Sequence, residues 1–272
     1  MRQIYKSVFS YIKKTTVVLA ALTMFLPLSV SALNSKNVNV NQDVKAPTTS
    51  PFCTNLPTET ANINSKLSVL IANANQNWST KNQKWQTIWT NVDQNVANER
   101  AKADATRQAE FTKLQAKAKN SSEQQAVTNY IDAVNNAVSI RRQAYDSARQ
   151  TFRSSVEAAI NARQSIVTQQ FDTLQNTVNS AVSIAQASCT SDPSSGQSVH
   201  SLFQSTLRNA QATFQSDRKS DATIVSQVKS LAATRNNAFT DADQTFKNTI
   251  TSARQTLIQA FTKSANNASA VN

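Results

Sequence analysis

The chain has 272 residues, with 28 Lys and Arg against 16 Asp and Glu, a single His and a single Gly. Hydrophobic residues make up 39% and aromatic residues 7%, and much of the apolar content is Ala. This composition cannot fill a thick globular core, but it suits the narrow seam between long helices, where Ala lets backbones approach. The counts alone exclude a glycine-rich phosphate loop and a two-histidine metal site.

The N-terminal segment is typical of a secretory signal peptide. Four basic residues without an acid precede an apolar run, Thr15 to Val30, and the small residues Val30-Ser31-Ala32 follow. We predict that residues 1–32 are a signal peptide cleaved after Ala32, which places the chain in a secreted, periplasmic or cell-surface location with no transmembrane segment after cleavage. A retained anchor is the alternative, although Pro27 interrupts the run and the run is short for a membrane span.

Two compositions follow the signal segment. Residues 33–56 are polar and contain Pro47 and Pro51, so we expect a disordered linker there. Residues 57–270 are expected to form one long helical domain, because neither Pro nor Gly occurs from Thr58 to Asp192 or from Gln197 onward.

Apolar residues in this domain recur every three or four positions, as in a coiled-coil seam. A turn at Ser121 divides the first long run, since Ser121 with Gln124, or Ser122 with Gln125, fits a helix capping box. The predicted helices span about 58–119, 122–188 and 198–268. The predicted fold is all-α, an elongated antiparallel up-down-up bundle of three helices, each roughly 90 to 105 Å long.

An internal repeat suggests an alternative with four helices. Residues 141–156 align without gaps on residues 235–250, an offset of 94, and the same offset carries Ser122 onto Ser216. A further turn near Ser216–Ser220 would therefore divide the third helix. We favour one continuous helix, because the seam keeps its phase from Leu207 to Val228.

The two cysteines are predicted to form a disulfide. Ser121 lies 68 residues after Cys53 (121 − 53) and 68 residues before Cys189 (189 − 121). Two antiparallel helices that turn at Ser121 bring the cysteines to the same height, and cysteines in an oxidising compartment usually pair.

No set of residues indicates catalysis. His200 and Gly196 are each the single residue of their type, and the acids are dispersed along long helices rather than gathered on loops. We therefore expect a protein that is not an enzyme and that holds neither a metal nor a cofactor.

All three tryptophans, Trp78, Trp85 and Trp89, lie in one short stretch of the first helix. Packing in the seam is the favoured interpretation, with Trp89 the most exposed of the three. The alternative is an aromatic contact patch for a glycan or a peptide.

Charged residues in or beside the seam are predicted to form polar layers. If the first two helices turn at Ser121, residue i lies level with residue 242 − i. If the next turn lies near Pro193, residue j lies level with residue 386 − j. The resulting layers comprise Glu99, Arg141, Arg142 and Asp243 in one, and Asp93, Arg149 and Arg235 in the other. Such layers fix helix register; the alternative is solvated charges that flank the seam.

The charge indicates the kind of partner. Without the four basic residues of the signal segment, 24 basic residues face 16 acids, a formal excess of +8. No basic stripe interleaves with aromatic residues, so specific nucleic-acid binding is not indicated. Anionic cell-envelope polymers, lipid headgroups or another surface protein are the expected partners.

The favoured function is an exported, non-enzymatic helical rod with a structural, spacer or adhesive role at a bacterial-type cell surface. A periplasmic or extracellular holdase chaperone, which shares the export signal and the basic charge, is the alternative. A pore-forming helical toxin component ranks last, because no stretch after Val30 is continuously apolar for ten residues.

Cleavage after Ala32 predicts that the protein isolated from cells that produce it natively begins at Leu33. Mass spectrometry of the intact protein and of its N-terminal peptide measures this directly. A chain that retains Met1 would instead support the membrane-anchored alternative.

Overall fold

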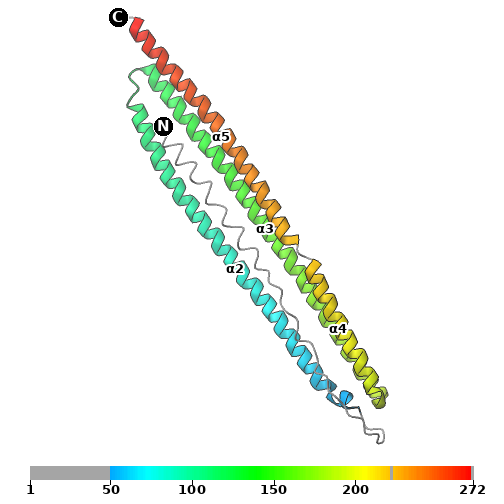
Figure 1. Cartoon of the computed structure of the whole chain (residues 1–272). Coiled ribbons are helices and arrows are strands. Elements are labelled where there is room, and N and C mark those ends of the chain that lie inside the picture. The colour runs from blue at the N-terminus through cyan, green and yellow to red at the C-terminus, as the bar shows by residue number, and fades with distance from the viewer. Residues whose placement is uncertain (1–49, 221–222, 271–272) are drawn as a thin grey trace. The chain divides into compact units, whose positions relative to one another are not determined.

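The computed structural model describes residues 50–220 and 223–270; the predicted signal peptide, its cleavage site and the linker up to residue 49 lie outside this part. The described part contains helices and no strand, which confirms the all-α prediction. Its elements are α2 (Pro51–Gln115), α3 (Ser121–Ser191), the 3-10 helix η3 (Pro193–Ser195), α4 (Gly196–Ser220) and α5 (Thr223–Ala270) (Figure 1).

The continuous third helix of the favoured three-helix arrangement is wrong. α4 ends at Ser220 and α5 begins at Thr223, so the four-helix alternative fits the described chain. Ser220, Asp221 and Thr223 are residue types with low helix propensity, so the sequence at this point favours a helix end. The apolar period did not reveal the break because it keeps its phase on either side.

The first helix begins at Pro51 rather than at Thr58, so the linker prediction is wrong for residues 51–56. Proline is tolerated in the first turn of a helix, where its missing N–H would have no helical acceptor. Phe52 and Leu56 are buried, at 8% and 2% exposure, and their packing stabilises this first stretch of α2.

The connection between α2 and α3 is centred near the predicted tip, but its cap differs from both predicted ones. Asn120 Oδ1 accepts from the backbone N–H of Glu123 at 2.9 Å, and the Glu123 carboxylate accepts from the backbone N–H of Lys119 at 2.7 Å. Asn120 Nδ2 also donates to Ser264 Oγ at 2.7 Å, which joins the tip to α5. This cap, with the exposed Asn120 as N-cap and the buried Glu123 three residues later, replaces the expected serine capping boxes.

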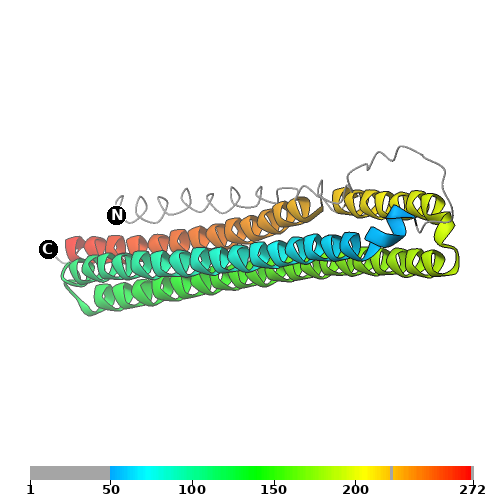
Figure 2. The same cartoon turned by 90° about the horizontal axis from the view of Figure 1, so that it is seen from below.

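The described chain forms two compact units. Unit 1 consists of residues 87–158 and α5 from Gln227, and unit 2 of the described residues up to Gln86 together with residues 159–226. Within unit 1, α5 runs alongside α3 in the view of Figure 1, and the Arg141–Asp243 ion pair joins the two helices; the view of Figure 2 draws α2 between them. The core of unit 2 is a narrow column of Ala, Val, Leu and Phe, in which Leu67 and Val178 are only 1% exposed.

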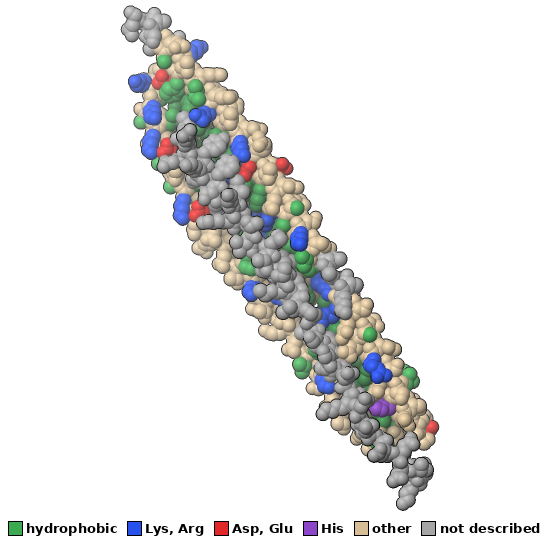
Figure 3. All heavy atoms as spheres, in the orientation of Figure 1, with side chains coloured by type: hydrophobic (Ala, Val, Ile, Leu, Met, Phe, Trp, Pro, Cys, Tyr) green, Lys and Arg blue, Asp and Glu red, His purple; other side chains and the backbone are tan. Residues whose placement is uncertain are grey.

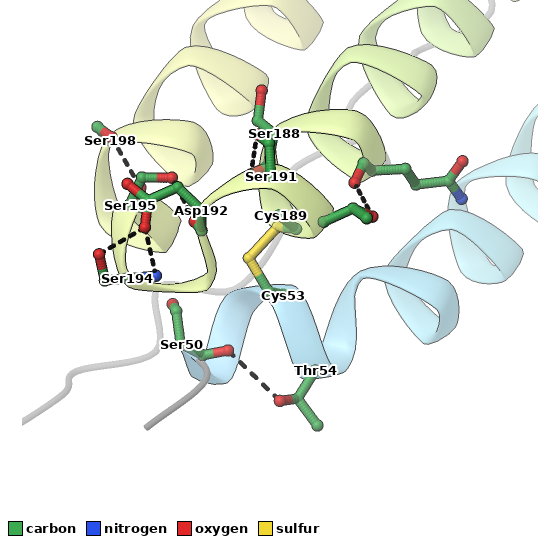
Figure 4. The surroundings of a disulfide bond; sticks show 12 residues. Ser50, Cys53, Thr54, Ser188, Cys189, Ser191, Asp192, Ser194, Ser195 and Ser198 are labelled. Atoms are coloured by element: carbon green, nitrogen blue, oxygen red, sulfur yellow. Dashed lines mark hydrogen bonds between the residues drawn. A yellow bond between two sulfur atoms is a disulfide. The ribbon is translucent and has the colours of Figure 1, made fainter. Parts of the chain in front are cut away.

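One end of unit 2 is closed by the predicted cysteine pair. The Sγ atoms of Cys53 and Cys189 lie 1.97 Å apart and their Cα atoms 5.5 Å apart, so the structure contains the disulfide between α2 and α3 (Figure 4). Asp192 then caps η3, because its Oδ1 accepts from the Ser194 backbone N–H at 3.0 Å and from the Ser194 hydroxyl at 2.6 Å. The turn expected near Pro193 is therefore one capped 3-10 turn.

Gly196 is required by a close approach rather than by an unusual backbone angle. A methyl group added there would lie 2.0 Å from Cβ and Oγ of Ser50 and 3.4 Å from Sγ of Cys53. Ser50 is itself held to the turn, because its N–H donates to the Pro193 carbonyl at 3.2 Å.

We expect Gly196→Ala to lower the thermal midpoint of unfolding. Overpacking costs about 1 to 3 kcal/mol, which exceeds the gain of about 1 kcal/mol that Ala brings over Gly in a helix. Gln197→Ala, at the exposed neighbouring position, is the matched control. A Gly196→Ala protein more stable than the parent in a circular-dichroism melt would contradict the close approach.

An arginine-lined pocket as the candidate functional site

The tryptophans pack in the helical bundle rather than form an exposed patch. Trp85 and Trp89 are 9% and 6% exposed and Trp78 is half-buried, so the expectation that Trp89 is the most exposed of the three is wrong. Trp89 is covered by the Phe152 ring, edge-on at 6.1 Å, and by the Arg153 guanidinium at 5.1 Å. Trp85 and Trp89 are therefore not available to a glycan or a peptide.

Three bidentate arginine–aspartate pairs join α2 to α3 in unit 1. Arg100 binds Asp146 at 2.8 and 2.9 Å, and the other two pairs are Arg142 with Asp104 and Arg153 with Asp93. These partners differ from the predicted ones. Glu99 pairs with Lys102 on its own helix rather than with Arg141 or Arg142, and Arg149 forms an ion pair with Asp146.

The partners differ because of the direction of helical side chains. In each of the three pairs the residue numbers add to 246, whereas the backbone symmetry about Ser121 predicted 242. Side chains on a helix lean toward its N-terminus. In antiparallel helices the side chains of the two helices therefore lean in opposite directions. Side chains that meet consequently come from residues whose numbers add to about four more, roughly one helical turn, than those of residues whose backbones lie level.

Arg141 and Asp243, which the sequence places at the same height, form an ion pair. Arg141 Nε donates to Asp243 Oδ1 at 2.6 Å, and the two side chains are only 19% and 16% exposed. The Arg141 guanidinium also lies over the Phe246 ring, 5.2 Å from its centroid. This pair joins α3 to α5, whereas Glu99 and Arg142 of the same predicted layer pair elsewhere.

The internal repeat packs against itself here. Tyr145 and Phe239, equivalent positions in the two copies, stack with centroids 4.1 Å apart and planes 5° apart. On one side of this stack Arg141 lies over Phe246, and on the other Arg235 lies over Phe152 at 4.5 Å. Equivalent residues thus make equivalent contacts.

One position breaks this symmetry. The residue equivalent to Asp243 is Arg149, so the ion pair of Arg141 has no counterpart at Arg235. Burial lowers the pKa of Arg235, and the nearby Arg149 charge lowers it further. The repeat therefore concentrates positive charge on one side of the stack.

A cavity of about 270 Å³ opens in unit 1 among α2, α3 and α5. Its lining residues are Glu99, Arg100, Lys102, Ala103, Thr106, Arg107, Val138, Arg141, Arg142, Tyr145, Arg149 and Phe246. Six of them are cations and one is an acid. The visible face of unit 1 likewise carries intermingled basic and acidic side chains (Figure 3). We call this cavity the arginine pocket.

The pairing within the arginine pocket leaves an excess of positive charge. Asp104 receives both Arg142 and Arg107, the latter at 2.7 Å. Asp146 receives both Arg100, at 2.8 Å, and Arg149, at 3.2 Å. Each of these two triads carries a formal charge of +1, because two guanidinium groups share one carboxylate.

The titratable groups of the site suit binding better than proton transfer. Hydrogen bonds from Arg142, and then from Arg107, outweigh partial burial and hold the pKa of Asp104 below its usual value. Burial raises the pKa of Tyr145. Asp104 is therefore a weak base and Tyr145 a weak acid at neutral pH.

The sequence identified only part of this site. It singled out Glu99, Arg141, Arg142, Arg149 and Asp243, but it missed the other members of the triads, namely Arg100, Asp104, Arg107 and Asp146. The available signal was the spacing of opposite charges on the two helices, seven and four residues apart at 93, 100 and 104 and again at 153, 146 and 142.

Residues 50–220 and 223–270 also bear on two further classes of site, metal centres and membrane spans. No three His, Cys, Asp or Glu side chains there are grouped so that they could hold a metal ion. None of the described helices combines the length and hydropathy needed to cross a membrane.

The chain matches no protein-family model, no curated protein sequence and no solved structure.

The triads predict a loss of stability in acid. The folded pKa of Asp104 lies below the unfolded value of about 3.9, so its contribution to the free energy of unfolding is present above that value and disappears as the pH falls through the folded pKa. Because Asp104 is 41% exposed, we expect that contribution to be about 1 kcal/mol or less.

Urea unfolding of the parent and of Asp104→Asn between pH 6 and pH 2 measures this term. The variant should be less stable at pH 6 and should lose less stability on acidification. Asp132→Asn makes the same change at an exposed position on α3 and should follow the parent. Parallel curves for the parent and Asp104→Asn would contradict the assignment.

Proposed function

We propose that this chain is an exported, non-enzymatic helical protein with a structural, spacer or adhesive role at the cell surface, where it binds an anionic component of the envelope. The proposal has two parts, the compartment and the partner, and a different observation supports each.

The observation that carries the proposal is the disulfide between Cys53 and Cys189. Disulfides persist in oxidising compartments and are rare in a reducing cytosol. The bond joins residues 136 positions apart, at the end of unit 2 where α2, α3 and the turn before α4 meet (Figure 4). Closing so long a loop stabilises by roughly 4 to 5 kcal/mol in the chain-entropy model. An exported protein would gain this stability and a cytosolic one would not.

The arginine pocket supports an anionic partner. Its two triads each keep a formal excess of one positive charge, and the part of the sequence after the predicted signal peptide has an excess of +8. Fixed positive charge attracts polyanions and raises their rate of association. The weak base and weak acid of the pocket favour recognition over catalysis.

Fractionation of cells that produce the protein natively tests both parts together. We expect the mature chain in the envelope or secreted fraction with both cysteines oxidised. It should bind isolated envelopes at low salt and be released at about 0.5 M salt, where the Debye length falls to about 4 Å.

Two outcomes would contradict the proposal. Protein found in the cytosolic fraction with free thiols would remove the assignment to the cell surface. Retention of unfolded polypeptides in preference to envelope material would favour the holdase alternative instead.

A further inference from the structure

We infer that the arginine pocket of unit 1 is a recognition site for an oxyanion, a phosphate or carboxylate group carried on a unit about the size of a monosaccharide. The inference rests on the proposed function only for the source of that unit, an anionic envelope polymer. The site itself is argued from the charges, hydrogen-bond donors and volume of the pocket.

The first argument is the number of donors. A guanidinium group has five N–H donors and a carboxylate has about four acceptor sites. Asp104 already accepts two bonds from Arg142 and lies within ion-pair distance of Arg107. Two guanidinium groups therefore offer more donors than one carboxylate accepts, even though Arg107 Nε also donates to Asn135 Oδ1 at 3.2 Å. An incoming oxyanion would receive the remainder.

The second argument is burial. The side chains of Arg149, Arg107 and Arg141 are 13%, 18% and 19% exposed, yet each contributes to the cavity wall. Charges held in such partly dehydrated positions interact more strongly with a ligand charge than charges on an open surface do. Arginine also matches phosphate and carboxylate through two parallel hydrogen bonds.

The third argument concerns size and the apolar wall. A volume of about 270 Å³ lies just below the range for ligand pockets, about 300 to 1,000 Å³, so the pocket fits one unit rather than a length of polymer. Val138, Tyr145 and Phe246 supply an apolar part of the lining. A sugar-sized ring can pack there while its charged group meets the guanidinium groups.

The competing explanation is that the triads only fix the register of α2 against α3. Register requires a single pairing of each Asp with one Arg, as Arg153 and Asp93 show in the same unit. It does not require the second arginine of each triad. The experiment must therefore change the charge of the pocket without disturbing the helix contacts.

Lys102 and Lys113 provide a matched pair for this purpose. Both lie on α2, each pairs with a glutamate three residues earlier, and their side chains are 75% and 68% exposed. Lys102 lines the pocket, and Lys113 is not among its lining residues. Reversal of either charge should leave folding unchanged because both side chains are exposed, and circular dichroism checks this.

Isothermal titration calorimetry of the oxidised mature chain at low salt tests whether the arginine pocket binds an oxyanion. The probes are inorganic phosphate, glucose 6-phosphate, glucuronate and neutral glucose. We expect the charged probes to bind and glucose not to bind. Lys102→Glu should weaken binding about tenfold, and Lys113→Glu should stay within about twofold of the parent. Asp104→Asn should strengthen binding, because Arg107 and Arg142 lose the carboxylate that they share.

Each result decides a separate point. Equal affinity in the Lys102→Glu and Lys113→Glu proteins, or no gain in Asp104→Asn, would overturn the pocket. Preference for glucose 6-phosphate points to a phosphate-bearing polymer, and preference for glucuronate to a uronic acid polymer. Phosphate binding without envelope binding would refute the proposed function and leave the pocket intact. Envelope binding that is unaffected by Lys102→Glu would refute the pocket as the binding site and leave the proposed function intact.

Discussion

The burial of arginine among helices with few large apolar residues governs the structure of unit 1. The guanidinium groups of Arg141 and Arg235 cover the rings of Phe246 and Phe152, and their aliphatic stems fill space that leucine would occupy in a richer core. A partly buried guanidinium is costly unless a carboxylate meets it. The aspartates that do so, such as Asp243, lie on facing helices and thereby set the helix register. Packing, register and pocket charge thus depend on the same few side chains.

Some features could be predicted by counting residues along antiparallel helices. The cysteine pair and the level placement of Arg141 and Asp243 depend only on backbone heights, and both are present. The choice of partner within a layer could not be predicted in this way. Asp93 binds Arg153 rather than Arg149, because opposite side-chain leans displace the partners of long side chains by about a turn. Counting must therefore include the direction of the side chain as well as the height of the backbone.

Helix ends are harder to predict, because the effect of a residue type depends on its position in the helix. Proline opposes helix at most positions, but Pro51 lies in the first turn of α2, where it is harmless. Serine at the tip fits a capping box, but Asn120 accepts the bond and Glu123 completes the cap. The candidate functional site is harder still to predict from the sequence. The triads that define the arginine pocket appear only when residues from distant parts of the chain are brought together.

The stack of Tyr145 on Phe239 brings equivalent residues of the internal repeat into contact, and this arrangement explains how unit 1 can carry an uneven charge. Contact between equivalent residues is a property of the two-fold axis of an isologous interface, in which one surface faces a copy of itself. The α3–α5 pair is thus laid out like the interface of a homodimer whose halves belong to one chain. Two identical subunits would need the same residue at positions 149 and 243. Within one chain the first is Arg and the second Asp, and this permits a lopsided charge that a symmetric dimer cannot have.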